Sequence, residues 1–161
     1  VTLSAHDELE FAILQCLRRR YGHVSAERVL SGSGLVDLYH ALVQVQGITG
    51  PEITSPAELL SQGLTQTDSV QRQTLDVFCG WLGSVAGDLA LTLGAVGGIY
   101  VGGGIAPRMS ECLVNSTFRQ RFVDKGRYQE YLQNIPTWLI NAPVSPALGG
   151  AALALDMLNA L

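Results

Sequence analysis

A short apolar run that leads directly into three consecutive glycines is the strongest constraint on the fold of this chain. Ile99–Val101 consists of β-branched and aromatic residues, which favour a strand, and Gly102, Gly103 and Gly104 follow at once. Glycine has no Cβ, so it can adopt left-handed backbone and lets another group approach the main chain closely. Ligands of open α/β sheets bind beyond the carboxyl ends of the strands. The segment therefore predicts a place where a flat ligand, such as a nucleotide base or ribose, lies on bare backbone. A tight strand-to-helix turn without a ligand is the alternative.

A second short apolar run, Thr137–Ile140, predicts another strand. Helical patterns lie between the two runs, and strands joined through helices favour a parallel pair with a right-handed crossover. A parallel pair needs both faces covered and further strands beside it. We therefore expect an α/β fold in which this chain is the helix-rich C-terminal part of a larger domain and contributes few strands.

The longest periodic segment, Asp68–Leu93, predicts a helix, because its apolar residues recur mostly every three or four positions. Gly80, Gly83 and Gly87 lie inside it, and each costs about 0.5–1 kcal/mol relative to alanine in a helix. We expect close packing of this helix against a neighbour to compensate. Other helices are expected at Ser4–Gly22, at Ser25–Leu30, from Ser33 to a loop at Gly47–Thr54, after a capping box at Ser55–Glu58, and at Pro107–Val114, Thr117–Phe122, Arg127–Leu132 and Pro146–Leu161.

Composition narrows the class of protein. The chain has 161 residues, the length of one domain, and its charged content of 15% is low, which indicates that part of its surface is normally covered. The net charge of −4 argues against a nucleic-acid partner, and Arg18–Arg20 is too short a basic run to change that. The apolar stretch Phe78–Ala106 carries Asp88 and several glycines, so a buried helix and strand explain it better than a membrane span.

The cysteines and histidines are scattered. Cys16, Cys79 and Cys112 form no C-x-x-C pair, which predicts reduced, buried thiols in a cytoplasmic protein, and no metal site is expected. The chain begins at Val1 with no basic-then-apolar leader pattern, so we expect a piece of a longer protein.

Five separated blocks, in order, carry a resemblance to a known family. They are HVSAERVLSGSGL (23–35), GGIYVGGGIAPR (97–108), FRQRFVDKGRY (118–128), IPTWLI (135–140) and PALGGAALAL (146–155). Together they resemble the C-terminal half of bacterial-type glucokinase, in the actin-like ATPase and sugar-kinase superfamily with its ribonuclease H-like fold. Ser33 stands where many members carry proline, a difference expected to change loop stiffness and little else.

The resemblance implies a cytoplasmic, glycolytic enzyme that transfers the γ-phosphate of ATP to the 6-hydroxyl of glucose, with Mg²⁺, and that forms a homodimer. The family's catalytic aspartate, its phosphate-binding loops and its Glu-Gly-Gly-His glucose motif precede the matched region and do not occur in this sequence. No catalytic residue and no metal ligand is therefore assigned here, and the isolated chain is expected to be inactive. The alternatives are a hexose kinase with another sugar or another phosphoryl donor, such as polyphosphate, and a non-catalytic sugar-sensing or assembly module.

The resemblance also assigns roles to single residues. Glu27 matches the glucose-binding glutamate, and one carboxylate can accept hydrogen bonds from two sugar hydroxyls. From the residues alone Glu27 would be an exposed helix position. Gly102–Gly104 match the adenosine-binding motif, whereas Ser31–Leu35 could touch the nucleotide or form a plain turn between helices. Residues 1–145 would then belong to the large domain, and residues 146–161 would form a helix that packs on the absent N-terminal domain.

Overall fold

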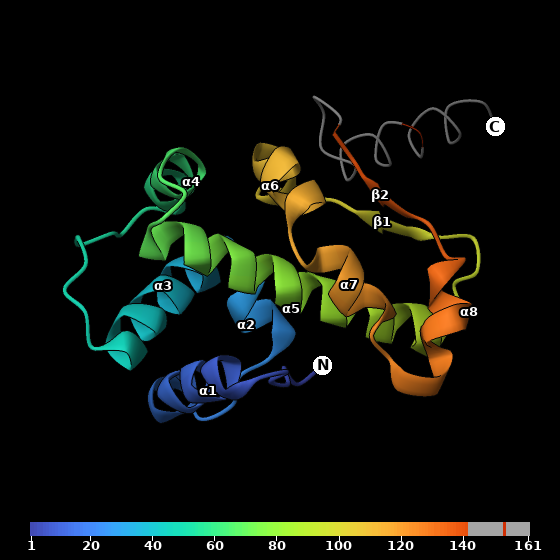
Figure 1. The fold of residues 1–161 in the computed structure, drawn as a ribbon, viewed down its shortest axis with the longest axis horizontal. Coiled ribbons are helices and arrows are strands. Elements are labelled where there is room, and N and C mark those ends of the chain that lie inside the picture. Colours follow the sequence, from blue (N-terminus) through green and yellow to red (C-terminus); the bar gives the residue numbers. More distant parts are fainter. Residues whose placement is uncertain (142–152, 154–161) are drawn as a thin grey trace.

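The computed structural model describes residues 1–141 and residue 153 (Figure 1). Within this part the protein is a helix-rich α/β structure with a single two-stranded sheet, as the sequence predicts. The helix expected at Pro146–Leu161, apart from position 153, lies outside the described residues.

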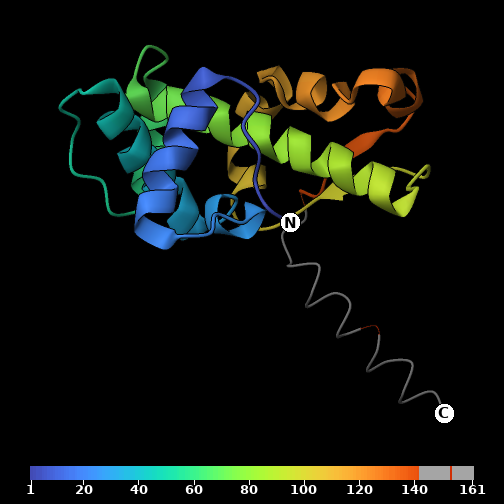
Figure 2. The same ribbon diagram turned by 90° about the horizontal axis from the view of Figure 1, so that it is seen from below.

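A long central helix, α5 (Val70–Leu93), organises the molecule. Figures 1 and 2 show it passing between the helices of the first part of the chain and those that follow the first strand. The first group comprises α1 (Glu8–Tyr21), α2 (Ala26–Val29), α3 (Gly32–Gln46) and α4 (Pro56–Thr65). The second comprises the 3₁₀ turn η1 (Ala106–Met109), α6 (Ser110–Asn115), α7 (Phe118–Val123), η2 (Gly126–Tyr128) and α8 (Gln129–Gln133).

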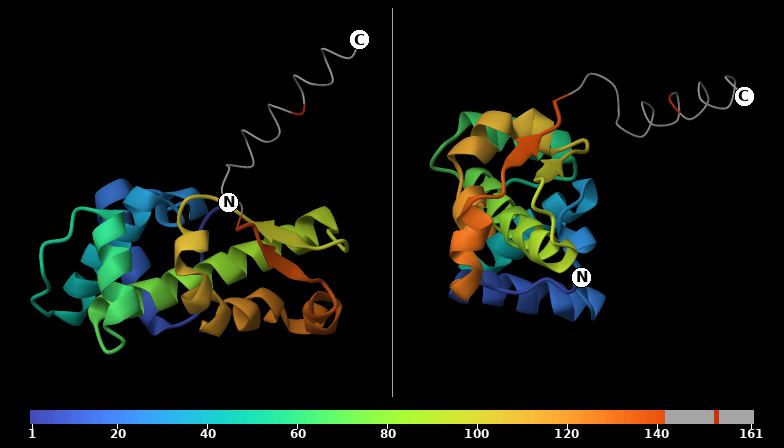
Figure 3. Two further views of the ribbon diagram at one scale, coloured as in Figure 1. Left: turned by 90° about the horizontal axis from the view of Figure 1, so that it is seen from above. Right: turned by 90° about the vertical axis from the view of Figure 1, so that its right-hand side faces the viewer.

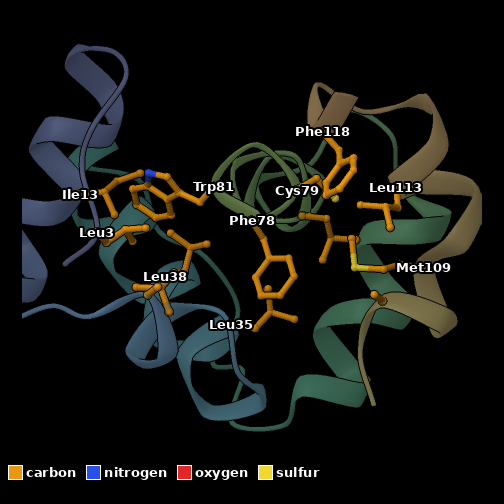
Figure 4. Close-up of a cluster of buried hydrophobic side chains, with 14 of the residues drawn as sticks. Leu3, Ile13, Leu35, Leu38, Phe78, Cys79, Trp81, Met109, Leu113 and Phe118 are labelled. Atoms are coloured by element: carbon orange, nitrogen blue, oxygen red, sulfur yellow. The ribbon is translucent and has the colours of Figure 1, made fainter. Parts of the chain in front are cut away.

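Both groups bury apolar side chains against α5, as Figure 4 shows. Trp81 meets Ile13 and Leu3 on one side, and Cys79 lies near Phe118 on the other. By length and composition alone α5 could cross a membrane, but 56% of its most apolar window is buried within the molecule. The helix is therefore the core element that the sequence predicts for this apolar stretch.

The glycines of α5 allow α7 to approach closely. A Cβ at Gly83 would overlap the carbonyl oxygen of Phe118, and one at Gly87 would overlap the carbonyl oxygen of Phe122. The close packing expected from these glycines is confirmed, because no larger residue fits at either position without separating the two helices.

A buried ion pair joins three helices across the core. Arg121 of α7 donates to Glu10 of α1 through Nη1 at 2.6 Å and through Nη2 at 3.0 Å, and its Nε donates to Ser84 Oγ of α5 at 3.0 Å. Glu10 is 2% exposed and Arg121 is 8% exposed. The backbone N–H of His6 also donates to Glu10 Oε2 at 2.8 Å, so the carboxylate is well satisfied.

The predicted helix starts were correct at Ser25 and Ser55 and wrong at two other positions. Helix α1 begins at Glu8 rather than near Ser4, because Asp7 Oδ1 accepts from the backbone N–H of Glu10 at 2.8 Å. Helix α3 is capped by Ser31 and does not start at Ser33. The Oγ of Ser31 accepts a hydrogen bond from the backbone N–H of Gly34 at 3.1 Å.

The third correction concerns the capping box expected at α4. The Ser55 side chain makes no cap hydrogen bond, although Pro56 occupies the first turn as expected. Glu58 instead accepts a hydrogen bond from Gln62 Nε2 at 3.0 Å, one turn further along the helix. That side-chain pair replaces the reciprocal contact that a capping box requires.

The sheet consists of β1 (Ile99–Val101) and β2 (Thr137–Leu139), which pair in parallel with Ile99 opposite Thr137. The predicted parallel pair is confirmed, and Figure 3 shows it lying along α5. One face packs on the core, whereas Tyr100 and Trp138 stack on the other face with their ring centroids 4.7 Å apart. These two side chains are 66% and 42% exposed.

All three thiols are free. Cys79 and Cys112 are buried as expected, whereas Cys16 is only half-buried and its thiol lies 3.0 Å from Gln44 Oε1. The expectation that every cysteine would be buried is therefore wrong at Cys16, because the groove between α1 and α3 leaves its side chain partly open.

Candidate nucleotide and sugar site

The triple glycine leaves the carboxyl end of β1 as open backbone. Gly103 has a φ of +114°, a conformation that side chains other than glycine rarely adopt. A Cβ at Gly103 or Gly104 would meet no atom within 4 Å, so both residues border free space. The left-handed backbone that the sequence predicts is thus found at Gly103, and the openness at Gly103 and Gly104, whereas a Cβ at Gly102 would lie 3.3 Å from Ile140.

These glycines line a cavity of about 450 Å³, a size typical of small-molecule sites. Three chain segments meet there: the turn between α2 and α3, the start of α4, and residues 101–108. Apolar side chains of α5 form part of the wall. The full lining consists of Leu30, Ser31, Gly32, Pro56, Phe78, Leu82, Val101, Gly102, Gly103, Gly104, Ile105, Ala106 and Arg108.

The turn between α2 and α3 contributes Ser31 and Gly32 to this cavity. The segment is also a tight helix–helix turn, because a Cβ at Gly34 would overlap the carbonyl oxygen of Arg28. The two interpretations of Ser31–Leu35 are therefore compatible: the same glycine-rich turn that joins the helices also borders the cavity.

Glu27 lies beside the cavity rather than in its wall. It is an exposed residue of α2, and Leu30, the C-cap of the same helix, lines the cavity. Within residues 1–141 the Glu27 carboxylate has no hydrogen-bond or ion-pair partner, so its oxygens are available as acceptors. Three positions separate Glu27 from Leu30 in the chain, and Leu30 borders the same cavity as the predicted nucleotide loop.

The first three residues of the chain hold α2 in place. The backbone N–H of Leu3 donates to the carbonyl of Val24 at 3.1 Å, and the N–H of Ala26 donates to the carbonyl of Val1 at 2.9 Å. Ser25 Oγ completes the arrangement by accepting from the Arg28 N–H at 3.2 Å. A helix of four residues is too short to be stable alone, so these contacts hold the backbone from which the Glu27 side chain extends.

Sequence reasoning missed part of the cavity wall. Phe78, Leu82 and Pro56 are distant in the chain from the triple glycine, so no local pattern placed them there. Arg108 is closer, four residues after Gly104, and a charge so near the glycine loop was the available signal. Its guanidinium has no ion-pair or hydrogen-bond partner among residues 1–141.

The described residues do not form a metal site of their own. No group of three or more His, Cys, Asp or Glu side chains within residues 1–141 is arranged to hold a metal ion. Mg²⁺ in phosphoryl-transfer sites is commonly held by one or two carboxylates together with the substrate phosphates.

Comparison with known proteins identifies the family. The family model described as Glucokinase matches residues 1–158. A glucokinase of Nitrobacter hamburgensis is 50% identical over 94% of this chain and 47% of its own length. One of Paramagnetospirillum magneticum is 47% identical over 99% of this chain and 50% of its own length. The crystal structure of a glucokinase from an Antarctic psychrotroph matches with a TM-score of 0.86 at 40% identity, over 97% of this chain and 48% of that one. The chain thus spans about half the length of the relatives it matches, and it belongs to the glucokinase family.

Proposed function

We propose that this chain forms the C-terminal half of a cytoplasmic, ATP-dependent glucokinase that transfers the γ-phosphate of ATP to the 6-hydroxyl of glucose. The observation that carries the proposal is the cavity of about 450 Å³ bordered by Gly102–Gly104, with Glu27 one helical turn from its wall. In this proposal residues 1–145 belong to the large domain of an actin-like ATPase fold, and residues 146–161 form a helix against the N-terminal domain.

Phosphoryl transfer depends mainly on positioning and on stabilising charge in the transition state. The open backbone of Gly103 and Gly104 offers a flat surface for the adenosine, and the apolar side chains of Phe78 and Leu82 exclude water beside it. Glu27 accepts hydrogen bonds from two sugar hydroxyls and so orients the sugar. This chain would thereby supply one wall of the nucleotide site and one arm of the sugar site.

The rest of the chemistry belongs to the half of the relatives that this chain does not span. Mg²⁺, when bound with the nucleotide, neutralises phosphate charge. The described residues provide no cluster of carboxylates for it, so we assign it no ligand in this chain. The general base and the phosphate-binding loops are likewise absent from the sequence.

The test compares the isolated chain with a full-length protein in which this chain supplies the C-terminal half. A coupled assay should show turnover with ATP and glucose for the full-length protein and none for the isolated chain, because loss of the base and the phosphate cradle removes several kcal/mol of transition-state stabilisation. Activity of the full-length protein with polyphosphate but not with ATP would assign another phosphoryl donor. Glucose binding without turnover by any donor would assign a sensor.

A further inference from the structure

Arg108 is the charged residue in the wall of the nucleotide cavity that the family resemblance leaves without a role. The other lining residues are apolar, glycine, proline or serine. The backbone of Arg108 is held firmly, since its N–H donates to the Ile105 carbonyl at 2.9 Å and its neighbours Ala106 and Met109 are buried. Its side chain is exposed and has no partner among residues 1–141. A fixed backbone that carries a free cation is suited to meeting a ligand.

The position of Arg108 indicates which part of a nucleotide it would meet. It also lines a neighbouring hollow of about 410 Å³ formed with Leu64, Arg72 and Cys112, to which no residue of α2 contributes. Arg108 thus borders the nucleotide cavity where it adjoins this hollow, and we infer that this side is the one away from α2 and Glu27. Because the γ-phosphate must reach a sugar held at Glu27, the phosphates lie toward α2 and the base lies toward Arg108.

We propose that Arg108 is a nucleotide-specificity residue whose guanidinium lies on the face of a purine base. This inference rests on the proposed function and deepens it. A guanidinium is planar and weakly hydrated, so it stacks on aromatic faces more readily than an ammonium does. The larger ring system of a purine gains more from this contact than a pyrimidine does, which gives ATP and GTP an advantage over CTP and UTP.

The experiment measures nucleotide use by the full-length enzyme with Arg108→Ala and Arg108→Lys. We expect Arg108→Ala to raise the KM for ATP about three- to tenfold, the scale of a cation–π contact, with the KM for glucose unchanged. The KM values for CTP and UTP should change less, so the difference in KM between purine and pyrimidine nucleotides becomes smaller. Arg108→Lys should restore little of the lost affinity for ATP, because lysine keeps the charge but not the planar group.

Binding of uncharged adenosine separates stacking on the base from contact with the phosphates. Arg108→Ala should weaken the binding of adenosine and of ADP by the same factor, as measured by calorimetry. A loss seen for ADP but not for adenosine, rescued by Arg108→Lys, would place Arg108 on the phosphates and overturn the proposal. Arg127→Ala is the matched control, because Arg127 is exposed and lies over the Tyr128 ring, outside the cavity.

Gly104→Val distinguishes failure of this inference from failure of the proposed function. Gly104 borders open space and does not have a left-handed φ, so valine fits there without strain and obstructs only a bound nucleotide. If Gly104→Val weakens ATP binding and Arg108→Ala does not, the Arg108 inference alone fails. If neither variant changes ATP binding, the cavity is not the nucleotide site.

Discussion

At the scale of single residues, Glu27 is the most direct test of sugar binding. Replacing it with glutamine in the full-length enzyme keeps its size and removes the charge. We expect glucose binding to weaken by about 1.5–3 kcal/mol, the range for hydrogen bonds to a charged group, while the KM for ATP stays the same.

Calorimetric titration with glucose measures this loss, and Glu52→Gln, at an exposed loop position, controls for the change in net charge. Equal losses of binding affinity for ATP and for glucose would show instead that Glu27 supports the structure of the site.

Gly103 tests the nucleotide loop in a different way from Gly104. Valine at Gly103 would place a β-branched side chain where the nucleotide approaches, and it would also strain a backbone with a φ of +114°. Gly103→Val should therefore harm ATP use more than glucose use and also lower the melting temperature. A folded Gly103→Val variant with unchanged KM for ATP would contradict the role given to the triple glycine.

The sequence predicts those site residues that belong to a recognisable local motif. Open backbone at Gly103 follows from glycine chemistry, and the role of Glu27 comes from the family resemblance. The position of Arg108 beside Phe78 and Pro56 was not predictable, because it depends on how α4 and α5 pack. The choice of Ser31 over Ser33 as the cap of α3 was not predictable either, since serine is a good cap at both positions.

At the scale of elements, the contact between α5 and α7 depends on glycine. Gly83→Ala should destabilise the fold by about 1–3 kcal/mol, the usual cost of overpacking, because the added Cβ overlaps the Phe118 carbonyl. Denaturant unfolding measures this. Gly97→Ala is the control, since a Cβ there meets nothing within 4 Å and the backbone is not left-handed. Equal stabilities for the two variants would mean that α7 can move away at little cost.

The buried pair of Glu10 and Arg121 should respond asymmetrically to substitution. Arg121→Met leaves the Glu10 carboxylate buried without its partner, and we expect a loss of about 3–5 kcal/mol in unfolding free energy. The double variant Glu10→Met with Arg121→Met should recover much of the lost unfolding free energy, since no unpaired charge remains in the core. A double variant as unstable as Arg121→Met would show that shape, rather than charge, governs this part of the core. No sequence pattern predicts this pair, because 111 positions separate the two residues.

At the scale of the whole molecule, the outer face of the sheet favours association. Tyr100 and Trp138 are exposed on it, and Leu93 and Val96 are exposed near the end of α5. Parallel sheets are normally covered on both faces, and exposed apolar patches recruit other chains. We therefore expect the isolated chain to dimerise or aggregate in light scattering. A monodisperse monomer at high concentration, with a cooperative melt, would contradict this expectation.

The parallel pair and the central helix were predictable because each has a strong local pattern and crossover rules join them. The homodimer expected from the family remains a proposal for the full-length protein. How the outer face is covered was not predictable, since this chain spans only about half the length of its relatives.

The strand-like contacts of Val1–Leu3 with Val24 and Ala26 have a mechanical consequence. Any segment joined ahead of Val1 continues directly from a backbone that is hydrogen-bonded to the start of α2. A rotation of such a segment would therefore act on the backbone at the start of α2, one residue before Glu27. In the two-domain kinase proposed above, a movement of the upstream domain would therefore also move α2, the helix that carries Glu27.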